Sequence, residues 1–128
     1  MKRSFIYIGL MLLTMGFYLT SCYKDALLPE ATVDPDGPPQ PVSYKNDLAP
    51  LFNTNCAVAG CHVTGSEKPY LSTDISYNEI VNHGYVNTIS PKLSILYDKI
   101  NGEMKEHIPN ATDRQKVYDW IRNGAPNN

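Results

Sequence analysis

A short segment in the middle of the chain places two thiols and an imidazole close together. It reads Cys56-Ala57-Val58-Ala59-Gly60-Cys61-His62, so four residues separate the cysteines and His62 follows the second one directly. Two cysteines followed at once by a histidine are typical of covalent haem attachment, where the usual spacer has two residues. In such a site both thiols bond to the porphyrin edge and the imidazole ligates the iron. These residues therefore predict a haem c held by Cys56, Cys61 and His62.

Residues 1–22 read as a processing segment rather than as part of the fold. A basic start is followed by an apolar run from Phe5 to Leu19, which is short for a membrane span of about 20 residues. The run ends in Leu19-Thr20-Ser21-Cys22, which resembles the lipobox of bacterial lipoproteins. We therefore expect cleavage before Cys22 and lipidation of its sulfur, which would anchor the protein in a membrane of the bacterial cell envelope. An ordinary signal segment with a chance cysteine is the alternative.

Residues 23–42 are expected to form a tether. Prolines recur along this stretch together with acidic residues and a glycine, and no helical or strand period persists. The position after Cys22 is Tyr23 and not aspartate, which is the inner-membrane retention signal of some bacteria. We therefore expect the outer membrane rather than the inner one.

The remaining segment, 43–128, is small for a core that supports itself. Domains this small often need a disulfide, a metal or a cofactor. Helix signals recur along this segment, and no run alternates as a strand would. The first is a cap at Ser43 before the apolar residues Tyr44, Leu48, Leu51 and Phe52, with a break expected at Pro50, and the second is a capping box from Ser76 to Glu79. The third is Ser90-Pro91, which precedes Leu93, Leu96, Tyr97 and Ile100 and is closed by Gly102. The fourth is a capping box from Thr112 to Gln115, which precedes Val117, Trp120 and Ile121 and is closed by Gly124. We expect an all-α domain of three to four short helices, with long loops around one haem.

Two other chemistries remain open for the central motif. A disulfide between Cys56 and Cys61 is permitted in an exported protein, and would make the chain a non-redox surface lipoprotein module. A zinc site would need Cys56, Cys61, His62 and one further histidine, but the sequence offers no second closely spaced ligand pair. The charge argues against nucleic acid as a partner, because the formal net charge is −2 and no basic stripe is present in the sequence.

Segments on both sides of the motif share a further pattern. They are Leu48-Ala49-Pro50-Leu51-Phe52, Asn55-Cys56, Ser94-Ile95-Leu96-Tyr97-Asp98-Lys99-Ile100, Ile108-Pro109 and the ending Trp120-Ile121-Arg122-Asn123-Gly124-Ala125-Pro126-Asn127-Asn128. In this order they resemble bacterial c-type cytochrome domains of the kind found in Bacteroidetes lipoproteins and planctomycete-type proteins. The resemblance covers essentially all of 43–128. It implies a small cytochrome c-like fold in a monomeric one-electron carrier, with other redox proteins of the cell envelope as partners.

The resemblance also implies a distal iron ligand, and the sequence departs from the pattern there. The family places a methionine, usually followed by proline, between the last two helices. The residue before Pro109 in this chain is Ile108, which cannot ligate iron, so Met104 and His107 are the candidates. A methionine ligand would give a higher potential than a second histidine. An open sixth site would instead suit a haem enzyme or gas sensor, which we rank below electron transfer because no acid–base pair is evident beside the haem.

Overall fold

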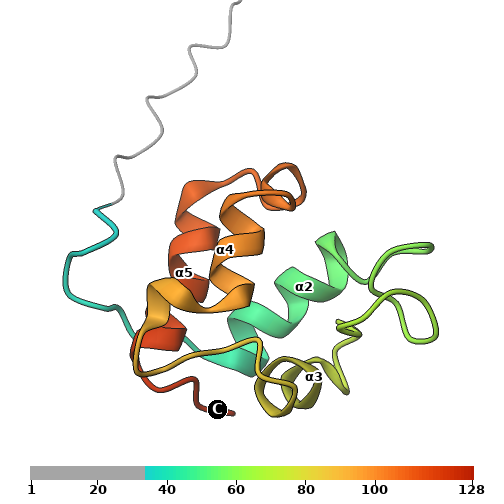
Figure 1. Cartoon of the computed structure of the whole chain (residues 1–128), viewed down its shortest axis with the longest axis horizontal. Coiled ribbons are helices and arrows are strands. Elements are labelled where there is room, and N and C mark those ends of the chain that lie inside the picture. Colours follow the sequence, from blue (N-terminus) through green and yellow to red (C-terminus); the bar gives the residue numbers. More distant parts are fainter. Residues whose placement is uncertain (1–33) are drawn as a thin grey trace, which may run out of the picture. The chain divides into compact units, whose positions relative to one another are not determined.

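The computed structural model describes residues 34–128, and this part of the chain is all-α (Figure 1). Its four α-helices are α2 (Ala49–Asn55), α3 (Ser76–Asn82), α4 (Ile95–Asn101) and α5 (Ala111–Arg122), and no strand occurs among the described residues. The prediction of an all-α chain with short helices is thereby confirmed. The expected signal segment, the lipidated Cys22 and the first part of the expected tether lie outside the described residues. No helix within 34–128 has the length and apolar character needed to cross a membrane.

The first helical segment begins at the predicted cap. The Oγ of Ser43 accepts a hydrogen bond from the backbone N–H of Asn46 at 3.2 Å, and a π-helical turn, η2 (Tyr44–Leu48), follows. Pro50 then lies in the first turn of α2, which continues directly from η2 because the N–H of Ala49 donates to the carbonyl of Tyr44. At the break expected at this proline, the helix changes from π to α geometry.

Tyr44 and Trp120 are at the centre of the core. Their ring centroids lie 5.1 Å apart, and Tyr77 packs edge-on against Tyr44 at 5.1 Å. The Tyr44 hydroxyl donates a hydrogen bond to the Oγ of Ser76 at 2.8 Å. Because these residues belong to η2, α3 and α5, the cluster joins the beginning of the domain to its last helix.

The two predicted capping boxes do not form. Ser76 is the first residue of α3 and is fully buried, because its Oγ serves as the acceptor for Tyr44 rather than as a cap. The cap of α5 is Asn110, whose Oδ1 accepts from the N–H of Thr112 at 2.8 Å, so Thr112 lies inside the helix. A better capping residue just upstream displaces the predicted one.

The helix expected to run on from Ser90 is interrupted. Pro91 opens only a short 3-10 turn, η3 (Pro91–Leu93), and α4 starts after Ser94, whose backbone is extended. The Ser94 Oγ accepts from the N–H of Asn87, seven residues earlier, at 2.9 Å, and this bond accompanies the break. Leu93 is therefore 75% exposed and does not join the apolar face, which was wrongly predicted to include it.

The last helix carries the predicted apolar face. Val117, Trp120 and Ile121 are all fully buried, and the chain turns away at Gly124, which has a φ of +90°. The N–H of Ala125 donates to the carbonyl of Trp120 at 2.9 Å, which completes the helix end. These predictions are confirmed, since both the apolar period and the terminal glycine are local signals.

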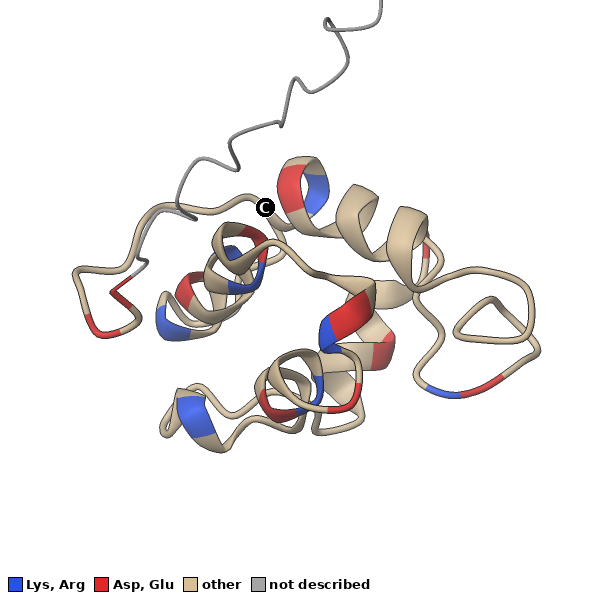
Figure 2. Cartoon of the chain, turned by 90° about the horizontal axis from the view of Figure 1, so that it is seen from above, with Lys and Arg blue, Asp and Glu red and all other residues tan. Residues whose placement is uncertain are grey.

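Part of the segment expected as a tether contacts the helices. The Nη2 of Arg122 donates to the carbonyl of Gly37 at 2.7 Å, and the N–H of Gln40 donates to the Oδ2 of Asp119 at 3.2 Å. Residues 37–40 are thereby attached to α5. Figure 2 shows that Lys and Arg lie beside Asp and Glu along the helices.

The buried phenol of Tyr44 makes the stability of the domain sensitive to alkali. Burial raises the pKa of Tyr44 to about 12, with the neighbouring Tyr77 adding to the effect and the hydrogen bond to Ser76 opposing it. The unfolded chain ionises this group near pH 10, so the stabilisation is present below about pH 10 and is lost as the pH rises to about 12. We expect the free energy of unfolding to fall by roughly 2–3 kcal/mol over this window, measured by urea unfolding at several pH values.

The variant Tyr44→Phe provides the control for this prediction. It should flatten the alkaline fall, although it removes the hydrogen bond to the buried Ser76 and should lower stability by about 1–3 kcal/mol at neutral pH. Equal alkaline slopes for the wild-type chain and the variant would contradict the assignment to Tyr44.

Candidate functional site

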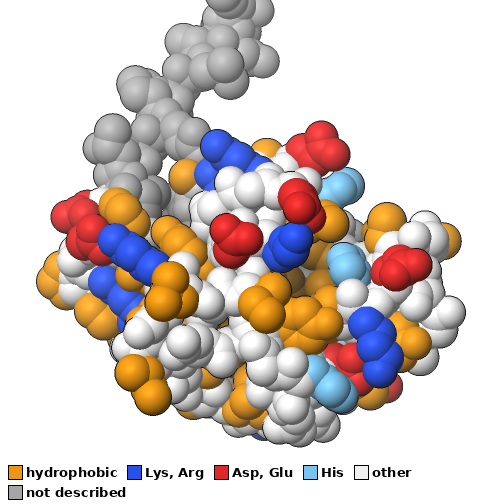
Figure 3. All heavy atoms as spheres, viewed as in Figure 1, with side chains coloured by type: hydrophobic (Ala, Val, Ile, Leu, Met, Phe, Trp, Pro, Cys, Tyr) orange, Lys and Arg blue, Asp and Glu red, His pale blue; other side chains and the backbone are white. Residues whose placement is uncertain are grey.

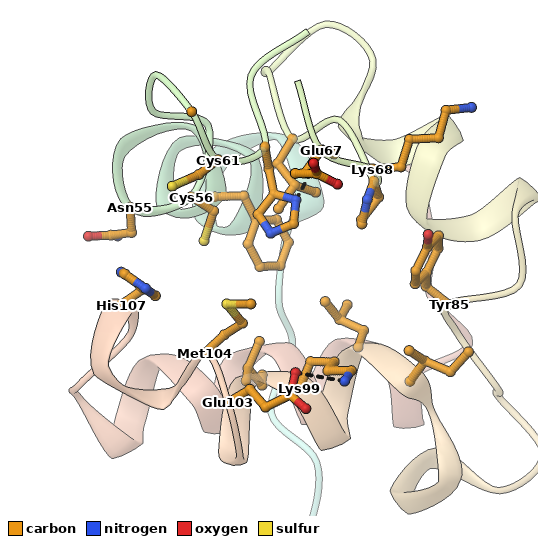
Figure 4. A pocket seen from close by; sticks show the side chains of 18 residues that line it. Asn55, Cys56, Cys61, Glu67, Lys68, Tyr85, Lys99, Glu103, Met104 and His107 are labelled. Carbon is orange, nitrogen blue, oxygen red and sulfur yellow. Dashed lines mark hydrogen bonds and ion pairs between the residues drawn. The ribbon is translucent and has the colours of Figure 1, made fainter. Parts of the chain in front are cut away.

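One cavity collects all five site residues that were predicted within the domain. It has a volume of about 450 Å³ and a mostly apolar lining, in the size range of cofactor pockets. Cys56, Cys61 and His62 contribute to it from the segment after α2, and Met104 and His107 contribute from the segment after α4. Figure 4 shows the two cysteines facing Met104 and His107 across the cavity. Two segments far apart in the sequence therefore form opposite walls of one site.

The motif folds into a compact loop despite its long spacer. The N–H of Cys61 donates to the carbonyl of Val58 at 3.0 Å, and the N–H of His62 donates back to the carbonyl of Cys56 at 3.0 Å. Gly60 has a φ of +83°, a conformation that glycine adopts without steric cost. The additional spacer residues are taken up by this turn, and both cysteines still reach the cavity.

The imidazole of His62 is oriented by a backbone carbonyl. Its Nδ1 lies 3.2 Å from the carbonyl oxygen of Glu67, and the N–H of Glu67 donates to the carbonyl of Cys61 at 2.9 Å. The N–H of Leu71 donates to the carbonyl of His62 at 2.7 Å and holds its backbone. The tautomer that donates from Nδ1 to Glu67 carries its free lone pair on Nε2. In that tautomer Nε2 is free to accept a hydrogen bond or to bind a metal.

The two cysteines are half-buried thiols that are not bonded to each other in this structure. Burial, and then the proximity of Cys61, raises the pKa of Cys56 to about 11. Cys56 is therefore a protonated thiol at neutral pH, whereas cysteines bind metals as thiolates. Within residues 34–128 no group of three or more His, Cys, Asp or Glu side chains is placed to hold a bare metal ion, and this includes the motif itself.

Met104 and His107 reach the opposite wall from one 3-10 turn. The turn η4 (Lys105–His107) follows Met104 directly, and the N–H of His107 donates to the carbonyl of Met104 at 3.1 Å. Side chains three residues apart eclipse in such a turn, so both point to the same side. Met104 is half-buried, whereas the His107 side chain is 45% exposed and its Nε2 lies 3.7 Å from the carboxylate of Glu106.

Ile108 occupies the position at which the family pattern has its methionine. Its side chain is only 1% exposed and packs in the core, and it is not part of the cavity lining. This position therefore serves packing, and the side chains able to bind iron lie just upstream.

The remaining lining of the cavity was not predicted from the sequence. Its floor is apolar and includes Phe52, Leu71, Tyr85, Leu96 and Ile100, and its rim includes Asn55, Glu67, Lys68, Lys99 and Glu103. Lys99 and Glu103 form an ion pair of 2.8 Å one helical turn apart. Spacings of three and four residues could have identified Leu96, Lys99 and Ile100 as one side of α4, with Glu103 in the turn just beyond its end. Figure 3 shows hydrophobic side chains together on one face, with charged and histidine side chains among them.

Comparison with protein-family models, curated proteins and solved structures found no match for this chain. The site is therefore defined by its own chemistry. It is a mostly apolar cavity with two thiols and an oriented imidazole on one wall, and a thioether and a second imidazole on the other.

Proposed function

We propose that the protein is a lipid-anchored monohaem c-type cytochrome, which carries single electrons in the bacterial cell envelope. The observation that carries the proposal is the single cavity that receives Cys56, Cys61 and His62 from one wall and Met104 from the other. The bound haem would supply reversible one-electron chemistry at its iron. The anchor and its place in the envelope rest on the lipobox ending at Cys22.

The residues of the cavity fit a covalently held haem. Cys56 is a protonated thiol, the form whose S–H adds across a vinyl group, with sulfur bonding to one carbon and hydrogen to the other and no change of oxidation state. His62 offers Nε2 to the iron because Nδ1 is directed at the Glu67 carbonyl. Phe52 and Ile100 provide apolar surface against which a macrocycle packs.

The arrangement of the elements supports a cytochrome c-like fold. The motif follows the first described α-helix, and Met104 lies between α4 and α5, the last two. His62 and Met104 both line the cavity, and they are the residues that would hold the iron of a bound haem. This favours an electron carrier over a haem enzyme or gas sensor, which needs an open position. The protein would then act as a monomer, and its partners would be other redox proteins of the cell envelope.

Covalent haem attachment is the first test. The chain produced together with a bacterial haem-attachment system should carry one haem, seen as a Soret band and a haem-sized mass increase that survives denaturation. Cys56→Ala combined with Cys61→Ala should abolish the covalent mass, because both thioethers are lost. A colourless wild-type protein, two hydrogens lighter than the fully reduced chain, would instead support the disulfide-stapled module.

A pair of glycine variants tests the geometry of the attachment loop. Gly60 and Gly84 both have positive φ, and a Cβ at either position meets nothing within 4 Å, but only Gly60 lines the cavity. Gly60→Ala and Gly84→Ala should each lower stability by about 1–2 kcal/mol through backbone strain alone. Only Gly60→Ala should also lower the fraction of protein that carries haem, measured by intact mass. Equal fractions for both variants would show that the loop geometry does not control attachment.

Substitution of the two candidate distal ligands assigns the sixth position. We expect Met104 to ligate the iron, because its side chain is half-buried whereas His107 is largely exposed. His107→Ala should leave the spectrum and potential unchanged. Met104→Ala should give a bis-histidine spectrum and a lower potential, since His107 shares the same side of the turn.

The double variant completes this test. Without Met104 and His107, the reduced protein should bind carbon monoxide readily. If His107→Ala alone changes the spectrum and Met104→Ala does not, the order of the two ligands is reversed.

A further inference from the structure

We propose that Arg114 is a positioning residue for the distal ligand, an inference that rests on the proposed function. Arg114 lies in the first turns of α5 and is only 8% exposed. Its Nη1 donates hydrogen bonds to the carbonyl oxygens of Ile108 and Pro109, each at 2.6 Å. These two carbonyls directly follow η4, the turn that carries the distal side chains.

The turn is thereby held at both ends. At its start, the N–H of Met104 donates to the carbonyl of Lys99 on α4 at 2.9 Å. At its end, Arg114 holds the carbonyls of Ile108 and Pro109 from α5. Because the cavity is bounded by this segment, these two attachments set how far Met104 extends toward His62.

The environment of Arg114 shows where its charge acts. Among residues 34–128 it forms no ion pair, and its Nε is buried without a hydrogen-bond partner. A buried guanidinium without a carboxylate is unfavourable unless hydrogen bonds satisfy it. Its strong, charge-assisted donors are directed at the backbone that follows the distal turn.

Arg122 on the same helix provides a matched control. It also has a buried Nε without a partner, and its Nη2 donates to the carbonyl of Gly37 at 2.7 Å and to Asp119 at 2.8 Å. It does not line the cavity and holds the segment near residue 37 instead of the distal turn. Substitution of Arg122 therefore disturbs a comparable buried group without touching the ligand.

The experiment compares Arg114→Met, Arg114→Lys and Arg122→Met as full-chain holoproteins. Carbon monoxide binding to the reduced protein and the reduction potential are measured alongside thermal stability. Arg114→Met should bind carbon monoxide at least tenfold faster than wild type and have a lower potential, because the distal ligand is no longer held. Arg114→Lys keeps a charged donor on a shorter side chain, so its rate of carbon monoxide binding and its potential should lie between those of wild type and Arg114→Met. Arg122→Met should be less stable than wild type, but its carbon monoxide binding and its potential should be those of wild type.

The results separate the two proposals. Wild-type ligation in Arg114→Met and Arg114→Lys, with stability lost as in Arg122→Met, would overturn the positioning role and leave the cytochrome proposal intact. A wild-type protein that takes up no haem would overturn the proposed function. In that case hydrogen exchange at the amides of Met104 and His107 tests whether Arg114 controls the turn. Faster exchange in the Arg114 variants alone supports control of the turn, and unchanged exchange overturns it.

Discussion

The packing of Tyr44 against Trp120 is the contact on which the rest of the domain depends. It joins η2 to α5, and the hydrogen bond from the Tyr44 hydroxyl to Ser76 joins both to α3. The ring of Phe52 also packs near Tyr44, with ring centroids 6.4 Å apart, and Phe52 is both fully buried and part of the cavity lining. The aromatic cluster therefore connects the core to α2, and the loop from Cys56 to His62 follows the end of that helix.

The cavity is an extension of this core. Phe52, Leu96 and Ile100 belong to the buried cluster and also line the cavity, so the same side chains pack on protein atoms on one side and face the site on the other. A domain this small gains stability from any apolar group that completes such a surface. Under the proposed function, a haem held at Cys56 and Cys61 would add contacts to this apolar lining, so covalent attachment and folding would support each other.

The parts of the structure that could be predicted from the sequence are those set by local signals. The apolar face around Trp120 follows from its spacing, and the cap at Ser43 and the turn at Gly124 depend on neighbouring residues alone. The predictions failed where a hydrogen bond to a residue outside the expected pattern decided the outcome, as at the cap of α5, which is Asn110 and not Thr112. Ser76 is held by Tyr44, which is distant in the sequence, and a bond from Asn87 to Ser94 accompanies the break before α4.

In the candidate site too, some features could be predicted from the sequence and others could not. Cys56, Cys61 and His62 are adjacent in the sequence, and Met104 and His107 follow from the methionine expected near Pro109. The orientation of His62 depends on the carbonyl of Glu67, and no side-chain pattern reports the direction of a backbone carbonyl. The apolar floor likewise appears only once α2 and α4 are placed in space.

The burial of Ile108 bears on where the proposed cytochrome would take its distal ligand, since the residue before Pro109 is committed to the core. An aliphatic side chain at this position packs in the core, while the carbonyls of Ile108 and Pro109 turn toward Arg114. With this residue committed to packing, the next side chains on the cavity side are His107 and, one 3-10 turn earlier, Met104. Such a short turn has few internal hydrogen bonds of its own. The hydrogen bonds from the buried Arg114 guanidinium on α5 therefore hold the backbone that directly follows it.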